Sequence, residues 1–121
     1  MTLEVNKITK IKKRNDRILE FDQEKIAIAI WKAIRSVGGR DKNLAIRLSE
    51  RLVELTNMKF SSSKIPTVED IQDMVEKVLM EQGQSKAAKA YILYREKRAE
   101  IREEKKAILE KDDIDEVDKH F

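Results

Sequence analysis

The amino-acid sequence predicts a mainly α-helical fold, in which four helices are capped by a small two-stranded β-hairpin and the C-terminal helix is extended. Two observations support this prediction. Apolar residues recur every three or four positions in four separate segments, each preceded by a residue that commonly caps helices. Near the N-terminus, two short runs of alternating character flank Asn15-Asp16, a pair that suits a tight turn. The 121 residues are enough for one domain with a modest core.

The hairpin is expected to pair a strand from Lys7 to Lys13 with a strand from Arg17 to Phe21. Two strands alone are marginally stable in water. We therefore expect the hairpin to lie on the helices, where it would act as a lid.

The first helix is predicted from about Asp22, its N-cap, to Val37, just before Gly38-Gly39. Its apolar residues cover more than one narrow face, which predicts a largely buried and central helix. These residues are Ile26, Ile28, Ile30, Trp31, Ile34 and Val37.

The second helix is predicted from about Lys42 to Asn57, with Asp41 as its cap. Its inward stripe consists of Leu44, Leu48, Leu52 and Leu55. The following segment from Lys59 to Pro66 contains three serines and the only proline, which indicates a loop.

A third helix is predicted to follow Thr67, its cap, and to end at about Gln82, with Asp70 placed as a partner for the cap. Its inward residues are Val68, Ile71, Val75, Val78 and Leu79.

The fourth helix is predicted to have Ser85 as its cap and to carry a face of small and aromatic residues, with Tyr91 in the core. This face consists of Ala87, Ala88, Ala90, Tyr91 and Tyr94. Beyond Tyr94 the chain has good helix formers but scattered apolar positions, which predicts an exposed continuation. Residues 111–121 are rich in Asp and are expected to form a linker.

Composition excludes several kinds of site. The chain has no cysteine, so disulfides, thiolate metal sites and cysteine catalysis are excluded, and with His120 as the single histidine no structural zinc site is expected. No apolar run approaches the length of a membrane span, and we expect a cytoplasmic protein that contacts no membrane. Residues 1–98 carry 21 Lys and Arg against 14 Asp and Glu, whereas residues 99–121 carry five against nine.

Three cations indicate a binding site for an anion. Lys13 and Arg14 belong to the hairpin, and Lys25 lies in the first turn of the helix capped by Asp22, where free backbone N–H groups favour negative charge. A lysine in a first helical turn opposes the helix dipole, so a nearby phosphate or carboxylate explains it better. Taken alone, Lys13-Arg14 is more typical of a solvated surface, but together the three residues favour a phosphate site.

Three segments, taken in order, resemble the ATP-cone family, a small nucleotide-binding regulatory domain found at the N-terminus of many ribonucleotide reductases. The first consists of Ile11, Lys12, Lys13-Arg14, Asn15-Asp16, Phe21, Asp22 and Lys25. The others are Pro66 to Glu76 and Ala88 to Arg95, and the resemblance covers roughly residues 5–98. We therefore expect an ATP-cone-like domain at residues 1–98, followed by a helical extension and acidic linker at residues 99–121.

The resemblance implies that ATP or dATP binds as an effector, and a Mg²⁺ ion held mainly by the triphosphate could accompany it. Lys13, Arg14 and Lys25 would hold phosphates, and Asp22 would lie near the base or ribose in addition to its role as a cap. The implied nucleotide-binding residues are Lys13, Arg14, Asp22, Lys25, Ile26, Thr67, Ile71, Gln72, Lys89, Tyr94 and Lys97. In this set Lys89 and Lys97 would contact phosphates, and Tyr94 would pack on the base or sugar. Without the resemblance, these three are a lysine pair facing solvent and a boundary tyrosine.

No catalytic constellation or Walker-type phosphate loop is present in the sequence, so we expect binding without hydrolysis. By resemblance, the chain is an allosteric sensor of overall activity. ATP would permit and dATP would restrain ribonucleotide reduction by a catalytic partner, by changing how the enzyme's chains associate, with a homo-oligomer formed through the cone. The hairpin and the serine loop are the parts expected to become ordered on binding.

Two alternative functions belong to other classes. Cones also occur in the repressor of reductase genes, and the basic surface of residues 1–98 is compatible with DNA. That repressor family carries a four-cysteine zinc ribbon, which this sequence lacks, so DNA is not expected as a partner. The other alternative is a helical interaction module, in which the cations pair with the carboxylates of another protein.

Overall fold

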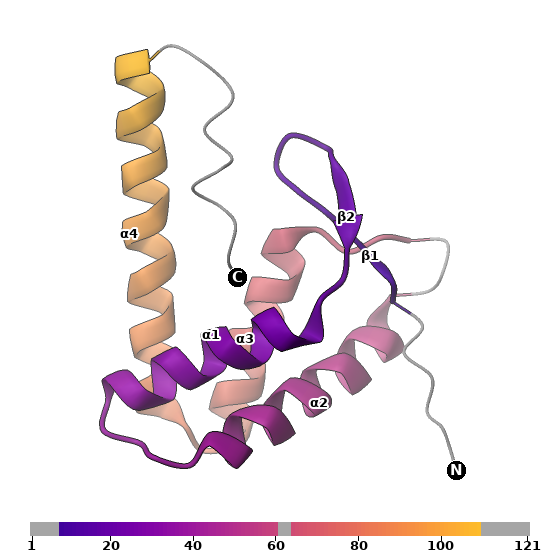
Figure 1. The fold of residues 1–121 in the computed structure, drawn as a ribbon, viewed down its shortest axis with the longest axis vertical. Coiled ribbons are helices and arrows are strands. Elements are labelled where there is room, and N and C mark those ends of the chain that lie inside the picture. The colour runs from indigo at the N-terminus through magenta and orange to yellow at the C-terminus, as the bar shows by residue number, and fades with distance from the viewer. Residues whose placement is uncertain (1–7, 61–63, 110–121) are drawn as a thin grey trace.

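The computed structural model describes residues 8–60 and 64–109. Within these ranges the chain forms a two-stranded hairpin followed by four helices, which confirms the predicted fold class (Figure 1). The elements are β1 (Lys10–Lys12), β2 (Ile18–Glu20), α1 (Gln23–Ser36), α2 (Lys42–Lys59), α3 (Val68–Glu81) and α4 (Ser85–Leu109). The three serines of the predicted loop, residues 61–63, and the whole predicted acidic linker, residues 111–121, lie outside the described residues.

The hairpin is shorter than predicted, with three residues in each strand. The antiparallel register pairs Lys10 with Glu20, Ile11 with Leu19 and Lys12 with Ile18. Only β1 is anchored: Ile11 is buried in the core, and the Lys12 N–H donates to the Pro66 carbonyl at 3.0 Å. All three residues of β2 are exposed, and the first residue after β2 that packs against the core is Phe21. The described hairpin is therefore attached to the start of α3 by one strand.

The turn of the hairpin forms at Asn15-Asp16, as predicted. The Lys13 N–H donates to the Arg17 carbonyl at 2.8 Å, and Asp16 has a φ of 69°. Asp tolerates this left-handed conformation better than most residues because its short polar side chain can bond locally.

The predicted caps of the first three helices are confirmed. Asp22 accepts from the Glu24 N–H at 3.0 Å, and Asp41 accepts from the Leu44 N–H at 3.1 Å. Thr67 and Asp70 form a complete capping box, in which each side chain accepts from the backbone N–H of the other residue. This box fixes the position at which α3 begins, beside β1.

Ser85 was expected to cap the fourth helix, and this expectation is wrong. Ser85 is the first residue of α4, and the Ala88 N–H donates to the Gln84 carbonyl at 2.9 Å. Gln84 therefore occupies the cap position. The preceding Gly83 has a φ of +76°, which lets the chain turn sharply between α3 and α4.

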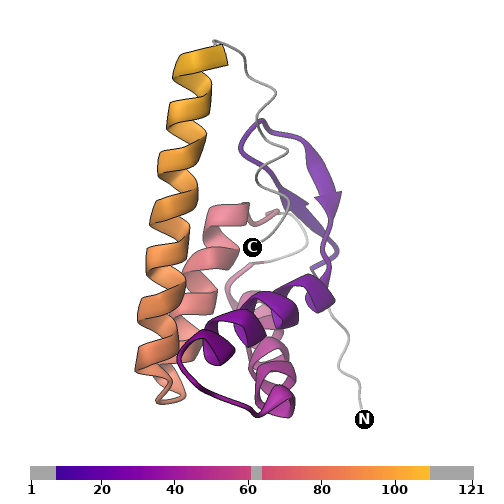
Figure 2. The same ribbon diagram turned by 60° about the vertical axis from the view of Figure 1, so that its left-hand side comes forward.

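The core lies among the four helices, because α1 and α3 each pack against both α2 and α4. The inward stripes predicted for α2 and α3 are confirmed, with Leu44 and Leu55 at the edge of the core. Helix α3 stands between α4 and the hairpin (Figure 2). Side chains of α3 can therefore contact both the hairpin and α4.

Helix α1 is less buried than predicted, because Ile28 is 49% exposed and Val37 is 42% exposed. The stripe formed by Ile26, Ile30 and Ile34, at spacings of four residues, faces the core. Helix α1 is therefore amphipathic and lies at the surface.

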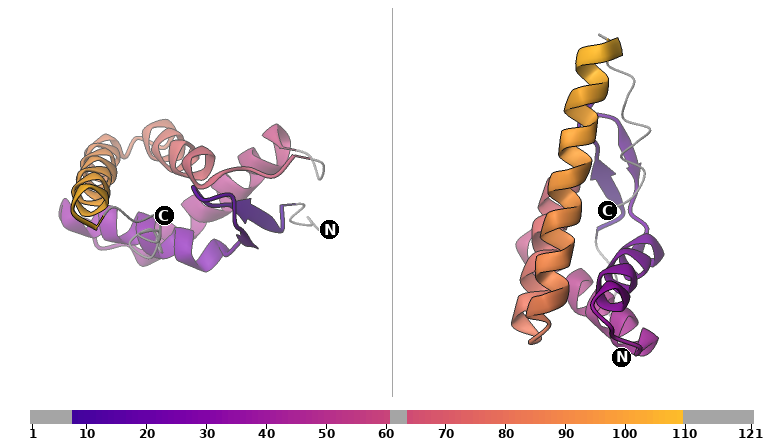
Figure 3. Two further views of the ribbon diagram at one scale, coloured as in Figure 1. Left: turned by 90° about the horizontal axis from the view of Figure 1, so that it is seen from above. Right: turned by 90° about the vertical axis from the view of Figure 1, so that its left-hand side faces the viewer.

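Helix α4 continues far beyond its buried part, as predicted. Its buried residues are Ala87, Ala88 and Tyr91, and the helix then continues to Leu109. Figure 3 shows this segment projecting past the other helices. Among the described residues, no helix is both long enough and apolar enough to cross a membrane.

Candidate functional site

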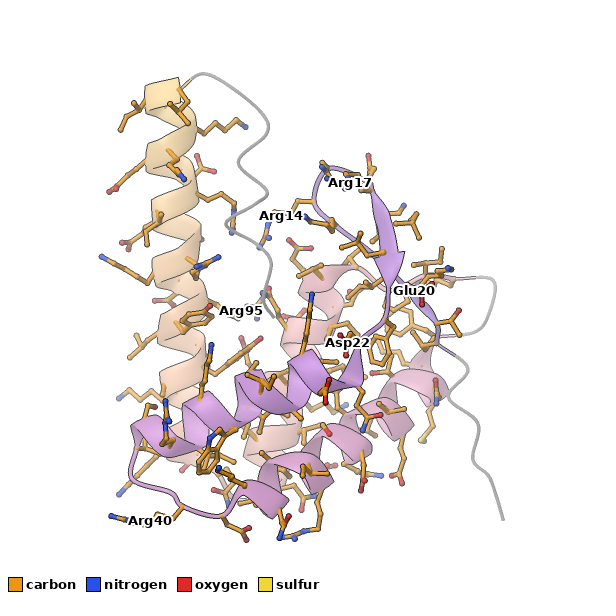
Figure 4. All side chains as sticks on the ribbon, viewed as in Figure 1. Arg14, Arg17, Glu20, Asp22, Arg40 and Arg95 are labelled. Carbon is orange, nitrogen blue, oxygen red and sulfur yellow. The ribbon has the colours of Figure 1, made fainter. Side chains whose placement is uncertain are left out.

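A pocket of about 280 Å³ lies between the hairpin turn, α3 and α4. Arg14 reaches it from the turn, and Gln72 and Glu76 line it from α3. The remaining lining comes from α4: Ile92, Tyr94, Arg95, Glu96, Arg98, Ala99 and Arg102. In Figure 4, Arg14 lies on the side of the hairpin turn that faces α4, and Arg95 extends from α4 toward the same space. We call this the arginine pocket.

The arginines of α4 share one face because Arg95, Arg98 and Arg102 are separated by three and four residues. Arg98 also lies over the ring of Tyr94, with its guanidinium carbon 5.9 Å from the ring centroid. Among the described lining residues, arginines outnumber carboxylates. Guanidinium groups bind phosphate oxygens through two parallel hydrogen bonds, so the pocket suits a phosphorylated ligand.

Two of the arginines are held by carboxylates of α3. The Arg14 Nε lies 2.8 Å from a carboxylate oxygen of Glu69. Arg95 donates to Asp73 at 3.0 Å and also to Glu76. Burial alone would lower the pKa of Arg95, but the hydrogen bonds that Arg95 donates to Glu76 and Asp73 outweigh this effect and raise the pKa above its ordinary value. Arg95 therefore stays cationic in the partly buried pocket.

A buried amide forms part of the pocket wall. Gln72 is only 7% exposed, and its Oε1 atom has no hydrogen-bond partner among the described residues. A buried acceptor without a partner is costly in free energy. A ligand group that donates a hydrogen bond to Gln72 would remove this cost.

A second pocket, of about 200 Å³, lies between α1 and α4. Small side chains leave this space open: Ala29 and Ala33 on α1 and Ala90 on α4. The other lining residues are Lys25, Ile28, Lys32, Ser36, Tyr91 and Tyr94. Its walls are mainly apolar, so we call it the apolar pocket. Because Tyr94 lines both pockets, they adjoin each other.

The structure brings four of the predicted residues to these pockets. Arg14 and Gln72 line the arginine pocket, Lys25 lines the apolar pocket, and Tyr94 lines both. Lys13, Lys89 and Lys97 are not among the residues that line either pocket. Their phosphate contacts remain a prediction.

The other four predicted residues have structural positions that need no ligand. The side chains of Asp22 and Thr67 accept from backbone N–H groups at the starts of α1 and α3. Ile26 and Ile71 are fully buried in the core. Any contact of these four with a nucleotide also remains a prediction.

Sequence reasoning missed Arg95, Arg98 and Arg102. They lie in the segment for which the sequence predicts an exposed helical continuation, and Arg102 lies beyond residue 98, where the predicted domain ends. Their spacing of three and four residues was a signal that could have identified a basic helix face. Their positions opposite α3 and the hairpin turn depend on helix packing, which the spacing does not indicate.

The donor atoms in residues 8–60 and 64–109 do not form a metal site of their own. Among the described residues, no three His, Cys, Asp or Glu side chains are placed to hold one metal ion. A cation that arrived with a phosphorylated ligand would depend mainly on the ligand's own oxygens.

Comparison with known protein families gives a match that covers most of the chain. The family model of the ATP cone domain matches residues 9–100. The matched range includes the hairpin, α1 to α3 and most of the α4 residues that line the two pockets.

Several relatives are ribonucleotide reductases. The vitamin B12-dependent ribonucleoside-diphosphate reductase of Thermoplasma acidophilum is 41% identical over 112 residues, which cover 88% of this chain and 14% of the relative. The enzyme of the same name from Mycobacterium tuberculosis is 31% identical, over 87% of this chain and 14% of the relative. The ribonucleoside-diphosphate reductase subunit alpha of Chlamydia pneumoniae is 32% identical, over 82% of this chain and 10% of the relative. The chain thus spans no more than about one seventh of these relatives.

Proposed function

The chain belongs to the ATP-cone domain family, and from this premise we propose that it binds ATP and dATP as allosteric effectors of a ribonucleotide reductase. It acts as a regulatory part of that enzyme and has no catalytic activity of its own. Its partners are the catalytic part of the reductase and, through the cone, further copies of the chain. The cytoplasm is the compartment proposed for this assembly.

The observation that supports nucleotide binding is the arginine pocket and its position beside the apolar pocket. A triphosphate carries several negative charges, which the guanidinium groups of Arg95, Arg98 and Arg102 can neutralise. A purine is flat and largely apolar, and it suits a space lined by alanines and a tyrosine ring. Because Tyr94 lines both pockets, one nucleotide can place its phosphates in the first and its base against Tyr94.

The hairpin is the element proposed to respond to the nucleotide. It carries Arg14 to the arginine pocket and is joined to the fold by the buried Ile11, by the hydrogen bond from Lys12 to Pro66 just before α3, and by the ion pair of Arg14 with Glu69. An effector regulates only if it binds two states with different affinity. A ligand that draws Arg14 toward its phosphates would favour a closed hairpin. ATP and dATP would differ in how strongly they favour that state.

Isothermal titration calorimetry with ATP, dATP and adenosine tests the proposal. ATP and dATP should release heat and saturate, whereas adenosine, which lacks phosphates, should bind far more weakly. Thermal unfolding followed with and without each ligand provides an independent measurement, because a ligand that binds only the folded state raises the midpoint. If neither ATP nor dATP produces heat or a thermal shift, the proposed function is wrong.

A further inference from the structure

Helix α3 presents a row of carboxylates to the arginine pocket. Glu69, Asp73 and Glu76 are separated by four and three residues and therefore share one face of the helix. Two of the arginines that a phosphate would use are already paired with this row: Arg14 with Glu69, and Arg95 with Asp73 and Glu76. A phosphorylated ligand must compete with these carboxylates.

The two carboxylates on Arg95 have different surroundings. The side chain of Asp73 is 69% exposed, so water can solvate it if Arg95 leaves. The side chain of Glu76 is only 26% exposed. A partly buried carboxylate that loses its cation keeps an unfavourable charge unless another donor replaces the cation.

A buried donor lies near the Arg95 and Glu76 pair, close enough for both charges to influence its pKa. The hydroxyl of Tyr91 has no hydrogen-bond partner among the described residues, although Tyr91 is only 2% exposed. Tyr91 lies four residues before Arg95 on α4, which places both side chains on one helix face. Burial chiefly raises the pKa of Tyr91, and the charges of Arg95 and Glu76 also influence it, so the hydroxyl is a protonated donor beside this ion pair.

We propose that Arg95 exchanges partners when a nucleotide binds: its guanidinium leaves Glu76 for a ligand phosphate, and the Tyr91 hydroxyl then donates to Glu76. This inference rests on the proposed function and adds the residues that couple the ligand to the fold. In the ligand-free state the Glu76 carboxylate accepts a hydrogen bond from Arg95, whereas the Tyr91 hydroxyl has no hydrogen-bond partner among the described residues. In the bound state the hydroxyl and the carboxylate satisfy each other, which offsets part of the cost of moving Arg95.

The exchange gives nucleotide binding a route to the rest of the protein. The Arg95 pairs with Asp73 and Glu76 link α4 to α3, and α4 is the helix that projects from the domain to Leu109. Moving Arg95 to a phosphate weakens this link near the base of the projecting segment. The ligand thereby changes how α4 is held on α3.

A double-mutant cycle, measured by calorimetry with ATP on the full chain, tests the exchange. The variants are Glu76→Ala, Tyr91→Phe and the two combined, and alanine is chosen because glutamine would keep an acceptor for the hydroxyl. Glu76→Ala should bind ATP about fivefold more tightly, because a competing negative charge is removed. Tyr91→Phe should bind ATP about threefold to fivefold more weakly, and this loss should vanish in the Glu76→Ala background.

Two controls separate the exchange from simpler effects. Glu81→Ala removes a carboxylate that pairs with Arg51 and lines neither pocket, so it should leave ATP affinity unchanged. Thermal unfolding of Tyr91→Phe without ligand should match or exceed that of the wild-type chain, because the hydroxyl has no bond to lose in that state.

The outcomes distinguish this inference from the proposed function. If the wild-type chain binds ATP but Tyr91→Phe has no effect, or has the same effect in both backgrounds, Arg95 does not exchange partners as proposed. If the wild-type chain binds neither ATP nor dATP, the proposed function itself fails and the exchange fails with it.

Discussion

Two ion-pair clusters of this protein each consist of one arginine and two carboxylates, but their surroundings differ. Arg51 on α2 pairs with Glu54 at 3.0 Å and with Glu81, the last residue of α3, at 3.3 Å. Arg95 on α4 likewise pairs with two carboxylates, both on α3. In each cluster one guanidinium thus joins α3 to a neighbouring helix.

The difference lies in what else is near the arginine. The side chain of Arg51 is 39% exposed, and Glu81 is the main reason that its pKa is raised. The side chain of Arg95 is 21% exposed and lines a pocket with other arginines. It also lies near the Tyr91 hydroxyl, which has no hydrogen-bond partner in the described part of the chain. An arginine with two carboxylates is therefore not a sign of function by itself. Its burial, the pocket beside it and the nearby donor distinguish the cluster that can exchange partners from the one that only joins two helices.

The largest expected effect is on nucleotide affinity, and it separates the arginine pocket beside Arg95 from the Arg51 cluster. Arg98→Ala combined with Arg102→Ala should weaken ATP binding about 100-fold, because each hydrogen bond to a charged group contributes about 1.5–3 kcal/mol. Calorimetry measures the affinity. Arg51→Ala is the matched control and should bind ATP like the wild-type chain, since Arg51 lines neither pocket. Equal losses in the double variant and the control would remove the functional distinction between the clusters.

A smaller effect on ATP affinity tests whether the two adjoining pockets hold different parts of the nucleotide. Ala90→Leu places a larger side chain in the apolar pocket, so it should weaken ATP binding about tenfold while leaving the binding of inorganic triphosphate unchanged. Ala107→Leu, an exposed substitution on the same helix, is its control. Calorimetry with both ligands gives the comparison. If Ala90→Leu weakens both ligands equally, the base does not use the apolar pocket.

The smallest effect is on stability. We expect the Arg51 cluster to stabilise the folded state slightly and not to bind nucleotide. The hydrogen bond from Arg51 chiefly lowers the pKa of Glu81 below its ordinary value of 4.5. A carboxyl whose pKa is depressed in the folded state stabilises it above the unfolded pKa, and this contribution is lost as the pH falls through the folded pKa. Glu81→Gln should therefore slightly lower the unfolding temperature at pH 7 and have no effect well below pH 4, as calorimetric scans at both pH values would show. An equal decrease at both pH values would mean that the charge of Glu81 is not responsible.

Most of the fold could be predicted because its signals are local. Asp22, Asp41 and Thr67 cap helices through atoms two or three residues away, and the leucine stripe of α2 needs only a helical period. The sequence pattern overestimates how much of α1 is buried. Helical spacing shows which apolar residues share a face, but it does not show which of them contacts another helix. Ile28 illustrates this: it is exposed, and it lines the apolar pocket.

The site was less predictable because it depends on contacts between distant segments. Resemblance to a family led to Arg14, Gln72 and Tyr94, all of which line the arginine pocket. The role suggested for Arg95 depends on Asp73 and Glu76, which lie on a different helix 22 and 19 residues earlier in the chain. Helical spacing within α4 could identify a basic face, but only the packing of α4 on α3 brings that face to these carboxylates.

The crystal structure of the chain with dATP is the most direct test of nucleotide binding in the arginine pocket. We expect the phosphates between the hairpin turn and α4, in contact with Arg98, and the guanidinium of Arg95 turned from Glu76 to a phosphate oxygen. A nucleotide bound elsewhere on the chain, with Arg95 still paired to Glu76 and no ligand atom in the arginine pocket, would contradict both the proposed site and the exchange.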